Sequence, residues 1–296
     1  MNIAYIILAH KNPEQVNRLT KALRYPGVSM HIHIDQKTDI KTFYDKCTHD
    51  ADKDLFFIHN RVDIKWGRFS IVQSILNALD EVIRNTFIDT PDYIFLLSGQ
   101  DYPIVSCKTF SDFLTAKAGK EFISAAKFPT PFWAPDGGYN RVNKFYFGDI
   151  IKWRYIQKPL QLLMPERDFP KGFHPYGGPM WWGITKKCAE YVIEFIMNNP
   201  DFLTFFKGTA VMDEIFFHTI IMNSEFGENA FEILEGSEML DSMRYLRWCK
   251  KQPWHPEILK TIDFETIIGS TRYFARKFDT TVDSKILDLI DEHRKG

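Results

Sequence analysis

Short apolar runs and helical patterns alternate through the first hundred residues. Ile3–Ala9 is a continuous apolar run, as expected for a strand buried on both faces. Helical patterns cover Pro13–Leu23 and residues 69–83, and further short strands are predicted at residues 55–58 and 93–97. Strands that alternate with helices form a parallel sheet covered by helices, so the sequence predicts an α/β fold.

Polar side chains lie at the ends of two predicted strands. The strand at residues 30–35 alternates, which puts His31, His33 and Asp35 on one face. The strand at residues 93–97 runs into the turn at residues 98–101. Ligands of parallel sheets bind beyond the carboxyl ends of the strands. Residues 1–127 are therefore predicted to form a Rossmann-like nucleotide-binding half.

The face formed by His31, His33 and Asp35 has the residue types of a metal site, which is one interpretation. Iron oxygenases that use such a set have an all-β fold, whereas this chain alternates strands and helices. We favour the other interpretation, in which Asp35 holds a polar ligand or caps a turn.

The remainder of the chain differs in composition. Residues 128–139 are rich in Pro and Gly and read as a loop between two halves. Six of the seven tryptophans follow residue 130, and helices are predicted at residues 187–197 and 212–222. We expect residues 1–296 to form a single domain, in which residues 128–296 are the acceptor-binding and catalytic half. A core rich in aromatic residues is the plainer explanation of the tryptophans.

Charge and cysteine content restrict the class of protein. The chain has 37 Lys and Arg against 38 Asp and Glu, so no basic excess attracts nucleic acid. Four cysteines lie far apart without a CxxC pair, which fits a reducing compartment but leaves a disulfide open. The apolar start lacks the features of a signal peptide. We expect a cytoplasmic protein that rests peripherally on a membrane through its substrate.

Several common catalytic motifs are absent from the sequence. GxGxxG, GxxxxGK[ST], GxSxG and HExxH do not occur, which removes support for dehydrogenases, P-loop NTPases, serine hydrolases and zincins. Asp50-Ala51-Asp52 and Asp52-Lys53-Asp54 match the Asp-x-Asp of metal-dependent sugar-nucleotide transferases. They precede a strand instead of following one, so we favour a solvated turn. An enzyme of that type would need another source of positive charge.

The C-terminal region offers such a source. Residues 244–277 contain eight basic residues against three acidic ones. Fixed cations can stabilise a leaving diphosphate as a metal ion does, although most basic clusters are solvated surface. Arg276 and Lys277 lie between Phe274 and Phe278, and these apolar anchors favour a functional interpretation.

Glu214 is a candidate general base. It is predicted near the start of the apolar helix 212–222, where burial would raise its pKa and the helix N-terminus would lower it. Such a carboxylate can take a proton from a sugar hydroxyl. Alternatively, Asp213 and Glu214 only satisfy the first-turn amides, and spacing does not decide between these readings.

These segments resemble the core-2/I-branching N-acetylglucosaminyltransferase and peptide O-xylosyltransferase family, glycosyltransferase family 14. The similarity runs along nearly the whole chain and depends on the order of its segments. The segments are AYIILAHK from residue 4, HIHID from 31, WG at 66, LLSGQDYPI from 96, GGPMWW from 177, DEIFF from 213, RYLRW from 244 and FARKFD from 274.

The resemblance implies an inverting, GT-A-like transferase of a bacterial type that needs no metal or other cofactor. It implies that Glu214 is the catalytic base. The residues implied in donor binding are His10, Asp35, Trp66, Gly67, Gln100, Asp101, Lys260, Arg276 and Lys277. Those implied in acceptor binding are Trp181, Asp213, Arg244 and Trp248. One departure is Glu257, since many relatives have a basic residue there, and Lys260 is the candidate replacement.

The expected reaction moves a sugar, GlcNAc in the first instance, from a UDP-sugar to a hydroxyl of a glycan or glycoconjugate acceptor, forming a β-linkage. UDP-xylose is the alternative donor. A glycan-binding protein that kept the fold without activity is the alternative from another class. A lipid-linked acceptor would account for the expected membrane association.

Overall fold

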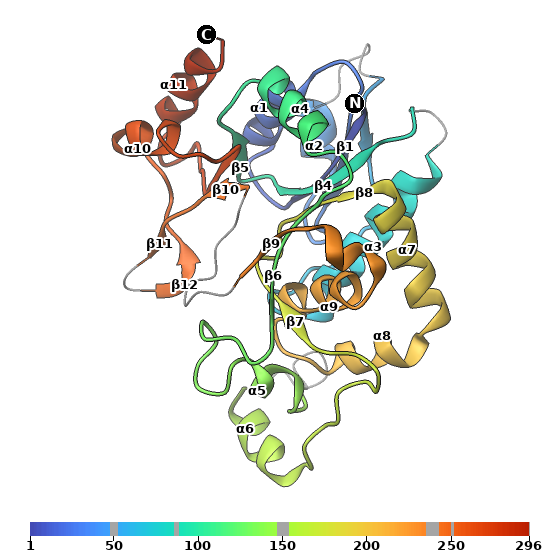
Figure 1. The fold of residues 1–296 in the computed structure, drawn as a ribbon. Coiled ribbons are helices and arrows are strands. Elements are labelled where there is room, and N and C mark those ends of the chain that lie inside the picture. Colours follow the sequence, from blue (N-terminus) through green and yellow to red (C-terminus); the bar gives the residue numbers. More distant parts are fainter. Residues whose placement is uncertain (48–52, 86–88, 147–153, 235–242, 250–251, 296) are drawn as a thin grey trace. The chain divides into compact units, whose positions relative to one another are not determined.

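The structure is a computed structural model that describes residues 1–47, 53–85, 89–146, 154–234, 243–249 and 252–295 (Figure 1). The chain divides into two compact units. Unit 1 comprises residues 1–61, 84–119 and 241–296, and unit 2 comprises residues 62–83 and 120–240. The C-terminal segment thus joins the N-terminal unit, so the units differ from the two halves expected along the sequence.

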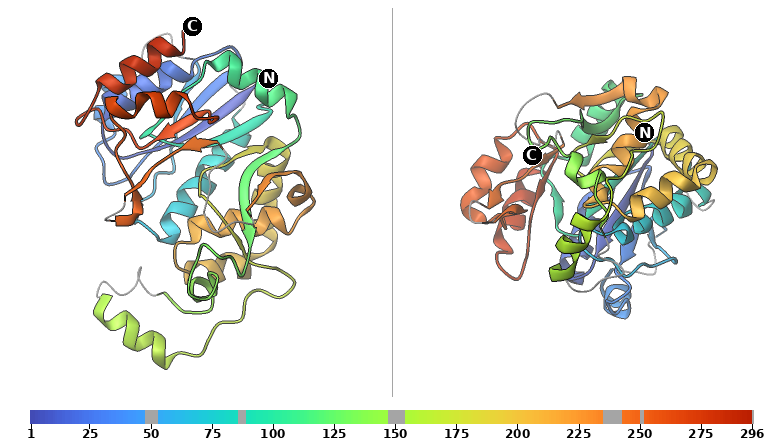
Figure 2. Two further views of the ribbon diagram at one scale, coloured as in Figure 1. Left: turned by 60° about the vertical axis from the view of Figure 1, so that its left-hand side comes forward. Right: turned by 90° about the horizontal axis from the view of Figure 1, so that it is seen from below.

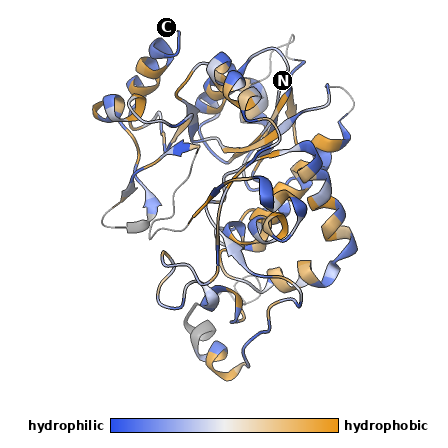
Figure 3. Ribbon diagram, in the orientation of Figure 1, coloured by the Kyte–Doolittle hydropathy of each residue, from blue (hydrophilic) through white to orange (hydrophobic). Residues whose placement is uncertain are grey.

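Unit 1 contains a parallel sheet in which β1 is central. Strand β1 (Ile3–Ala9) pairs in parallel with β2 (Val28–Ile34) and with β4 (Tyr93–Ser98), and β2 pairs in parallel with β3 (Leu55–Phe57). Strands β1 and β4 are coloured mostly hydrophobic in Figure 3. The predicted α/β class, with helices flanking a mostly parallel sheet, is confirmed.

Strand β2 differs from its predicted alternation. His31 and His33 are as buried as Met30 and Ile32, so both faces of the strand are covered. The ring of His31 stacks on Phe56 with centroids 5.0 Å apart. The polar face expected from the alternation is therefore interior, because helices cover both sides of a parallel sheet.

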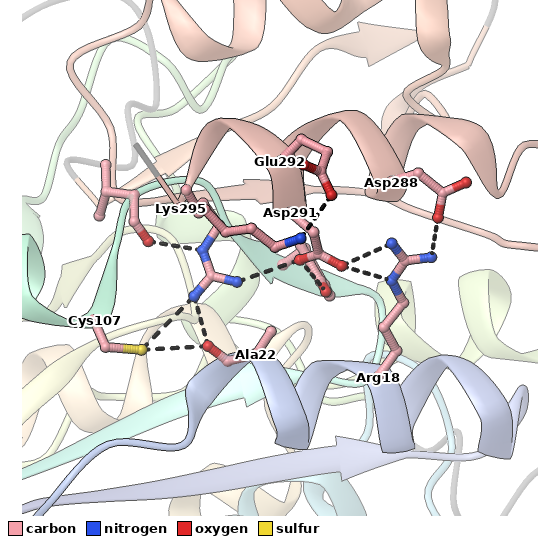
Figure 4. A network of polar contacts seen from close by, with 10 residues as sticks. Arg18, Ala22, Cys107, Asp288, Asp291, Glu292 and Lys295 are labelled. Atoms are coloured by element: carbon pink, nitrogen blue, oxygen red, sulfur yellow. Dashed lines mark hydrogen bonds and ion pairs between the residues drawn. The ribbon is translucent and has the colours of Figure 1, made fainter.

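The described residues of unit 1 contain five α-helices. They are α1 (Pro13–Leu23), α2 (Lys41–Cys47), α4 (Cys107–Ala116), α10 (Phe264–Ile268) and α11 (Lys285–His293). Polar contacts join α1 to α11, the last helix (Figure 4). Arg18 in α1 forms ion pairs with Asp288 at 2.8 Å and with Asp291 at 2.7 Å. All four cysteines of the chain are free thiols.

The C-terminal segment enters unit 1 through a small second sheet. Strand β13 (Phe274–Arg276) lies between β10 (Arg244–Tyr245), to which it is parallel, and β5 (Asp101–Pro103), to which it is antiparallel. This pairing puts Arg276 opposite Asp101. The turn that follows β4 and the basic segment before Lys277 are therefore neighbours. Strands β11 (Trp248–Cys249) and β12 (Gln252–Pro256) form a separate antiparallel pair.

Unit 2 is arranged around β6 (Glu121–Lys127). This strand pairs antiparallel with β7 (Tyr176–Gly177) and β8 (Gly183–Thr185), and parallel with β9 (Ala230–Ile233). The helices of the unit are α3 (Phe69–Arg84), α5 (Tyr139–Val142), α6 (Arg154–Leu163), α7 (Lys186–Asn198), α8 (Pro200–Lys207) and α9 (Phe216–Met222). In Figure 2 β6 is the long green strand, and α9 contacts it.

Aromatic side chains fill the interior of unit 2. Phe216 in α9 contacts Phe69, Phe202, Phe206 and Phe217, with ring centroids between 5.2 and 6.2 Å apart. The plainer explanation of the aromatic content, a heavy core, therefore holds for these residues. No helix in the described parts of the chain has the length and apolar character needed to cross a membrane.

The helix predicted at residues 212–222 is broken. Met212–Glu214 form a short 3₁₀ turn, and the α-helix α9 begins only at Phe216. The Glu214 carbonyl, which a continuous helix would bond to His218, instead accepts from the Gly178 N–H at 2.9 Å. Glu214 therefore lies in the turn before the helix, and the predicted position near a helix start is corrected.

Candidate active site

The carboxyl ends of β1 and β2 lie side by side in unit 1. The Asp35 N–H donates to the carbonyl of Ala9, the last residue of β1, at 2.9 Å. His10 and Lys11 come directly after Ala9 in the sequence. Asp35 Oδ1 accepts from the Lys37 N–H at 3.0 Å, and Oδ2 lies 3.3 Å from Lys37 Nζ. The carboxylate thus caps the turn after β2, as one interpretation of the sequence had it.

Positive charges are crowded at this sheet edge. Desolvation, followed by the charges of Arg276 and Lys11, lowers the pKa of Lys277, against the effect of Asp279, which pairs with Lys11 at 2.6 Å. Desolvation and the charges of Lys11 and Lys277 also lower the pKa of His10, against the effect of Asp35. The charged forms of Lys277 and His10 are thus disfavoured by burial and by neighbouring positive charge, and an anion bound beside them would relieve that repulsion.

The backbone around Lys277 is held on both sides. The Leu259 N–H donates to the Lys277 carbonyl at 2.9 Å, and the Phe278 N–H donates to the Gln100 carbonyl at 2.9 Å. The Gln100 side chain returns a bond of 3.2 Å from Nε2 to the Phe278 carbonyl. Gln100 therefore orients the Lys277 segment through the main chain.

Asp101 is buried beneath the neighbouring arginines. Its Oδ2 lies 3.2 Å from Arg244 Nε, and its Oδ1 lies 3.5 Å from Arg276 Nε. The side chain of Arg244 is wholly buried, and that of Arg276 is 11% exposed. Asp101 thus pairs with both arginines, and this buried pairing holds the Arg276 side chain in place. Their predicted ligand contacts stay predictions.

Glu257, where many relatives have a basic residue, has a nearby ion-pair partner. Glu257 and Asp263 both form ion pairs with Arg247. Lys260 is exposed, and its N–H donates to Asp263 Oδ2 at 2.8 Å at the start of the turn Thr261–Asp263. Glu257 is therefore balanced by Arg247, and the replacement role of Lys260 stays a prediction.

The aromatic candidates differ in exposure. Trp248 in β11 is 38% exposed and Trp66 is 70% exposed, whereas Trp181 is half-buried. Gly67, next to Trp66, has a φ of +66°, which favours glycine. Exposed aromatic rings can stack on sugars, so the sugar-binding roles expected for these tryptophans stay predictions.

Glu214 meets an arginine in unit 2. Its Oε2 accepts from Arg141 Nη1 at 2.7 Å, and its side chain is 21% exposed. Desolvation raises the pKa of Glu214, and the charge and hydrogen bond of Arg141 oppose that rise. A carboxylate so placed is accessible, oriented and more basic than one in water would be.

Asp213, the preceding residue, is more deeply buried. Only 9% of it is exposed, and its Oδ1 has no hydrogen-bond partner among the residues that the structure describes. Desolvation and then the charge of Glu214 raise the pKa of Asp213. The two carboxyls therefore share one desolvated environment, but in the described part of the chain only Glu214 has a hydrogen bond from a cation.

The backbone before this pair is strained. Val211 has a φ of 47°, in the left-handed region that a β-branched residue rarely adopts. Such outliers concentrate at functional sites, where surrounding contacts keep them in place. Here Ala210 N–H donates to the Arg141 carbonyl at 3.2 Å, so the strained segment and α5 are tied together.

The sequence did not single out two residues of these sites, Arg141 in unit 2 and Lys11 in unit 1. Arg141 lies in a short helix after a Pro- and Gly-rich loop, and neither a spacing nor a motif marks it. Its guanidinium carbon lies 3.9 Å from the centre of the Trp133 ring. Lys11 directly follows His10 in the segment that carries the resemblance, and this adjacency was the available signal.

The sequence also offered two candidate metal sites, the face with His31, His33 and Asp35 and the acidic run at residues 50–54. His31 and His33 are interior to the sheet of unit 1. Asp50 and Asp52 lie outside the described residues. Asp54 is described, and it forms an ion pair with Arg24 at 3.3 Å.

Comparison with known proteins places the chain in a family. The family model of the core-2/I-branching enzyme matches residues 3–268. Xylosyltransferase sqv-6 of Caenorhabditis briggsae is 24% identical over 303 residues, which cover 95% of this chain and 35% of that protein. Xylosyltransferase 2 of Rattus norvegicus is 25% identical over 327 residues, which cover 100% of this chain and 34% of that protein.

The chain spans about a third of the length of these curated relatives. Among solved structures, the apo form of mouse xyloside xylosyltransferase 1 has a TM-score of 0.40 and 10% identity, covering 93% of this chain and 97% of that one. Because the family model matches most of the sequence, this chain belongs to the core-2/I-branching enzyme family.

Proposed function

We propose that this chain is an inverting glycosyltransferase that moves a sugar from a UDP-sugar to a hydroxyl of a glycan acceptor. The observation that carries the proposal is the Glu214 carboxylate, partly exposed and oriented by Arg141 at 2.7 Å, in a chain of this family. Family membership alone supports the reaction class, and this geometry supports the residue.

Glu214 acts as the general base in this proposal. It takes the proton of the acceptor hydroxyl while the hydroxyl oxygen attacks the anomeric carbon of an α-linked donor. The bond from that carbon to the UDP oxygen breaks, so a single displacement gives a β-linkage. One carboxylate suffices, unlike the pair that glycosidases need. A desolvated carboxylate with a raised pKa suits proton transfer near neutral pH.

Cations of unit 1 stabilise the departing UDP. Arg276 and Lys277 are held by Asp101 and by the backbone bonds around Phe278, and Lys11 adds a third charge. Negative charge grows on the diphosphate as the glycosidic bond breaks, so preorganised cations bind the transition state more tightly than the substrate. These side chains supply what a divalent ion supplies elsewhere, so we propose that activity needs no metal or other cofactor.

The identity of the donor has two candidates. UDP-GlcNAc is the first expectation, because branching enzymes of the family transfer GlcNAc. UDP-xylose is favoured by the relatives above, which are named xylosyltransferases. The proposal includes a cytoplasmic location and peripheral association with the inner membrane through a lipid-linked acceptor.

A UDP-release assay over a panel of UDP-sugars, with and without excess EDTA, tests the proposal. Glycan and glycoconjugate acceptors are supplied in parallel. We expect release with UDP-GlcNAc or UDP-xylose that EDTA does not reduce. Loss of activity in EDTA, restored by Mn²⁺, would overturn metal independence.

Sugar binding without UDP release, for every donor and acceptor in the panel, would favour the alternative of a glycan-binding protein. Product analysis by NMR gives the anomeric configuration. An α-linked product would overturn inversion.

A further inference from the structure

Arg141 is fixed from two sides. Its Nη1 donates to Glu214 Oε2 at 2.7 Å, and its guanidinium carbon lies 3.9 Å from the Trp133 ring centre. The ring is itself immobilised, since Phe128 meets it edge-on with centroids 5.2 Å apart and a Cβ on Gly177 would overlap it. The guanidinium therefore has a single defined position.

The carboxyl pair beside Arg141 is asymmetric. Glu214 receives the short bond from the guanidinium, whereas Asp213 Oδ1 is buried and has no partner in the described part of the chain. Two adjacent carboxyls in a desolvated environment do not both ionise without a large cost. The position of the cation decides which of the two carries the charge.

We propose that Arg141 is a positioning residue that makes Glu214, and not Asp213, the ionised carboxylate of the pair. The consequence is that the partly exposed member is kept ready to accept a proton, while the buried member stays neutral and can donate its own hydrogen. The proposal rests on the proposed function only in naming Glu214 as the base.

Among the residues that the structure describes, the titratable groups in α9 and near Arg141 are His218, Tyr146 and Asp136. His218 in α9 is wholly buried, and desolvation lowers its pKa to about 3, so it is neutral at physiological pH. Tyr146 lies near Arg141, and desolvation raises its pKa. Asp136, which acts on Tyr146, accepts from the Gly138 N–H at 3.2 Å. Among these groups, Arg141 is the cation bonded to the pair.

The direction of the two pKa shifts agrees with this geometry. The pKa of Asp213 is raised by desolvation and then by Glu214, and a backbone hydrogen bond and the more weakly felt charge of Arg141 only partly oppose that rise. The pKa of Glu214 is raised by desolvation alone, and the charge and hydrogen bond of Arg141 oppose that rise. Because the pair titrates together, the experiment must observe both carboxyls.

A carboxyl-carbon NMR titration of the full chain, labelled with ¹³C at Asp and Glu side chains, makes this observation. Signals are assigned by their loss in Glu214→Gln and in Asp213→Asn. In the wild type we expect Glu214 to titrate below Asp213. In Arg141→Gln the Glu214 midpoint should rise by about 1–3 pH units, the usual effect of losing an adjacent opposite charge. Arg141→Lys should retain much of the depression.

Arg167→Gln is the matched control. Arg167 also stacks on an aromatic ring, Phe205, at 3.9 Å, but it donates to the carbonyls of Phe205 and Gly208. The Arg167→Gln substitution should lower the melting temperature without moving the titration midpoint of Glu214. A wild-type order with Asp213 below Glu214, or an unmoved Glu214 midpoint in Arg141→Gln, would overturn the proposal.

The wild-type order is decisive even when Arg141→Gln fails to fold. The titration needs no substrate, so a result that overturns the role of Arg141 is distinguishable from a result that overturns the proposed function. If UDP release proceeds normally in Glu214→Gln while the midpoints follow the expected order, the base assignment fails and this inference stands.

Discussion

Arg244 and Asp101 form an ion pair that is closed to solvent, with Arg244 Nε 3.2 Å from Asp101 Oδ2 and neither side chain exposed. Oδ2 also accepts from the Ser98 N–H at 3.0 Å, and Oδ1 faces Arg276. One carboxylate thus ties the end of β4 to the strands β10 and β13. The C-terminal segment is attached to unit 1 by a charged interaction in the interior.

Asp101→Asn should destabilise the protein strongly. Removal of one partner leaves the Arg244 charge buried without compensation, which costs about 3–5 kcal/mol in comparable proteins. Urea unfolding followed by circular dichroism measures the change. Asp112→Asn is the control, because the Lys108–Asp112 pair is exposed and its loss should cost at most about 1 kcal/mol. Equal, small effects in both variants would contradict the prediction.

Local patterns in the sequence predicted the parallel sheet well. The bounds of β1 are those of the apolar run, because a strand buried on both faces needs no more than continuous apolar residues. The helix α1 likewise follows its periodic pattern from Pro13 to Leu23. In β2 the same logic failed, since alternating histidines imply a polar face that the structure buries.

Interactions between distant segments could not be predicted from these patterns. Strand β13 pairs with β5 across more than 170 residues, and no local property of either short strand specifies that partner. The break before α9 depends on the Gly178 N–H, 36 residues before Glu214. Arg141 was missed for the same reason, since its partner Glu214 lies 73 residues away.

Glu214→Gln should lower the rate of UDP-sugar turnover by about 10²–10⁴-fold, because the variant keeps the shape of the side chain and loses the base. Steady-state UDP release measures the change, and an unchanged melting temperature shows that the fold is intact. The control is Glu190→Gln in α7, whose carboxylate is 45% exposed and pairs with Lys186. Near-normal turnover in a folded Glu214→Gln protein would remove Glu214 from the mechanism.

Lys277→Gln should weaken binding of UDP but not of uridine. Desolvation and the charges of Arg276 and Lys11 disfavour the Lys277 ammonium, so an anionic ligand would stabilise it, and a hydrogen bond to a charged group is worth about 1.5–3 kcal/mol. We therefore expect the affinity for UDP to fall by about 10–100-fold. Isothermal titration calorimetry with both ligands gives the comparison. Lys295→Gln, on the exposed end of the chain, is the control. A parallel loss for uridine would argue against contact with the diphosphate.

Gly178→Ala should destabilise unit 2 and reduce activity together. A Cβ at this position would overlap the Ser124 carbonyl oxygen and crowd His218 Nε2, so the chain must shift. Overpacking of this kind costs about 1–3 kcal/mol, and the shift would disturb the bond from the Gly178 N–H to the Glu214 carbonyl. Urea unfolding and UDP release measure the two effects. In Gly208→Ala the added Cβ meets ordinary contact distances, so it should be tolerated.

His218 should make stability fall on acidification. Its pKa is lowered by burial to about 3 in the folded protein, against about 6.5 in the unfolded chain. Between these values the unfolded state binds one more proton, so the free energy of unfolding decreases as pH falls. The stability contributed by the neutral ring is complete above about pH 6.5 and is lost progressively below it.

The raised pKa values of Asp213 and Glu214 act in the opposite direction, so the test is a difference between proteins. From pH 7 to pH 5 the wild type should lose about 2 kcal/mol more than His218→Gln, which has no such proton to bind. His293→Gln, which removes an exposed imidazole of α11, is the control variant. Urea unfolding of the three proteins at pH 5, 6 and 7 gives the slopes. If the His218→Gln and wild-type curves run parallel, His218 takes up its proton without unfolding.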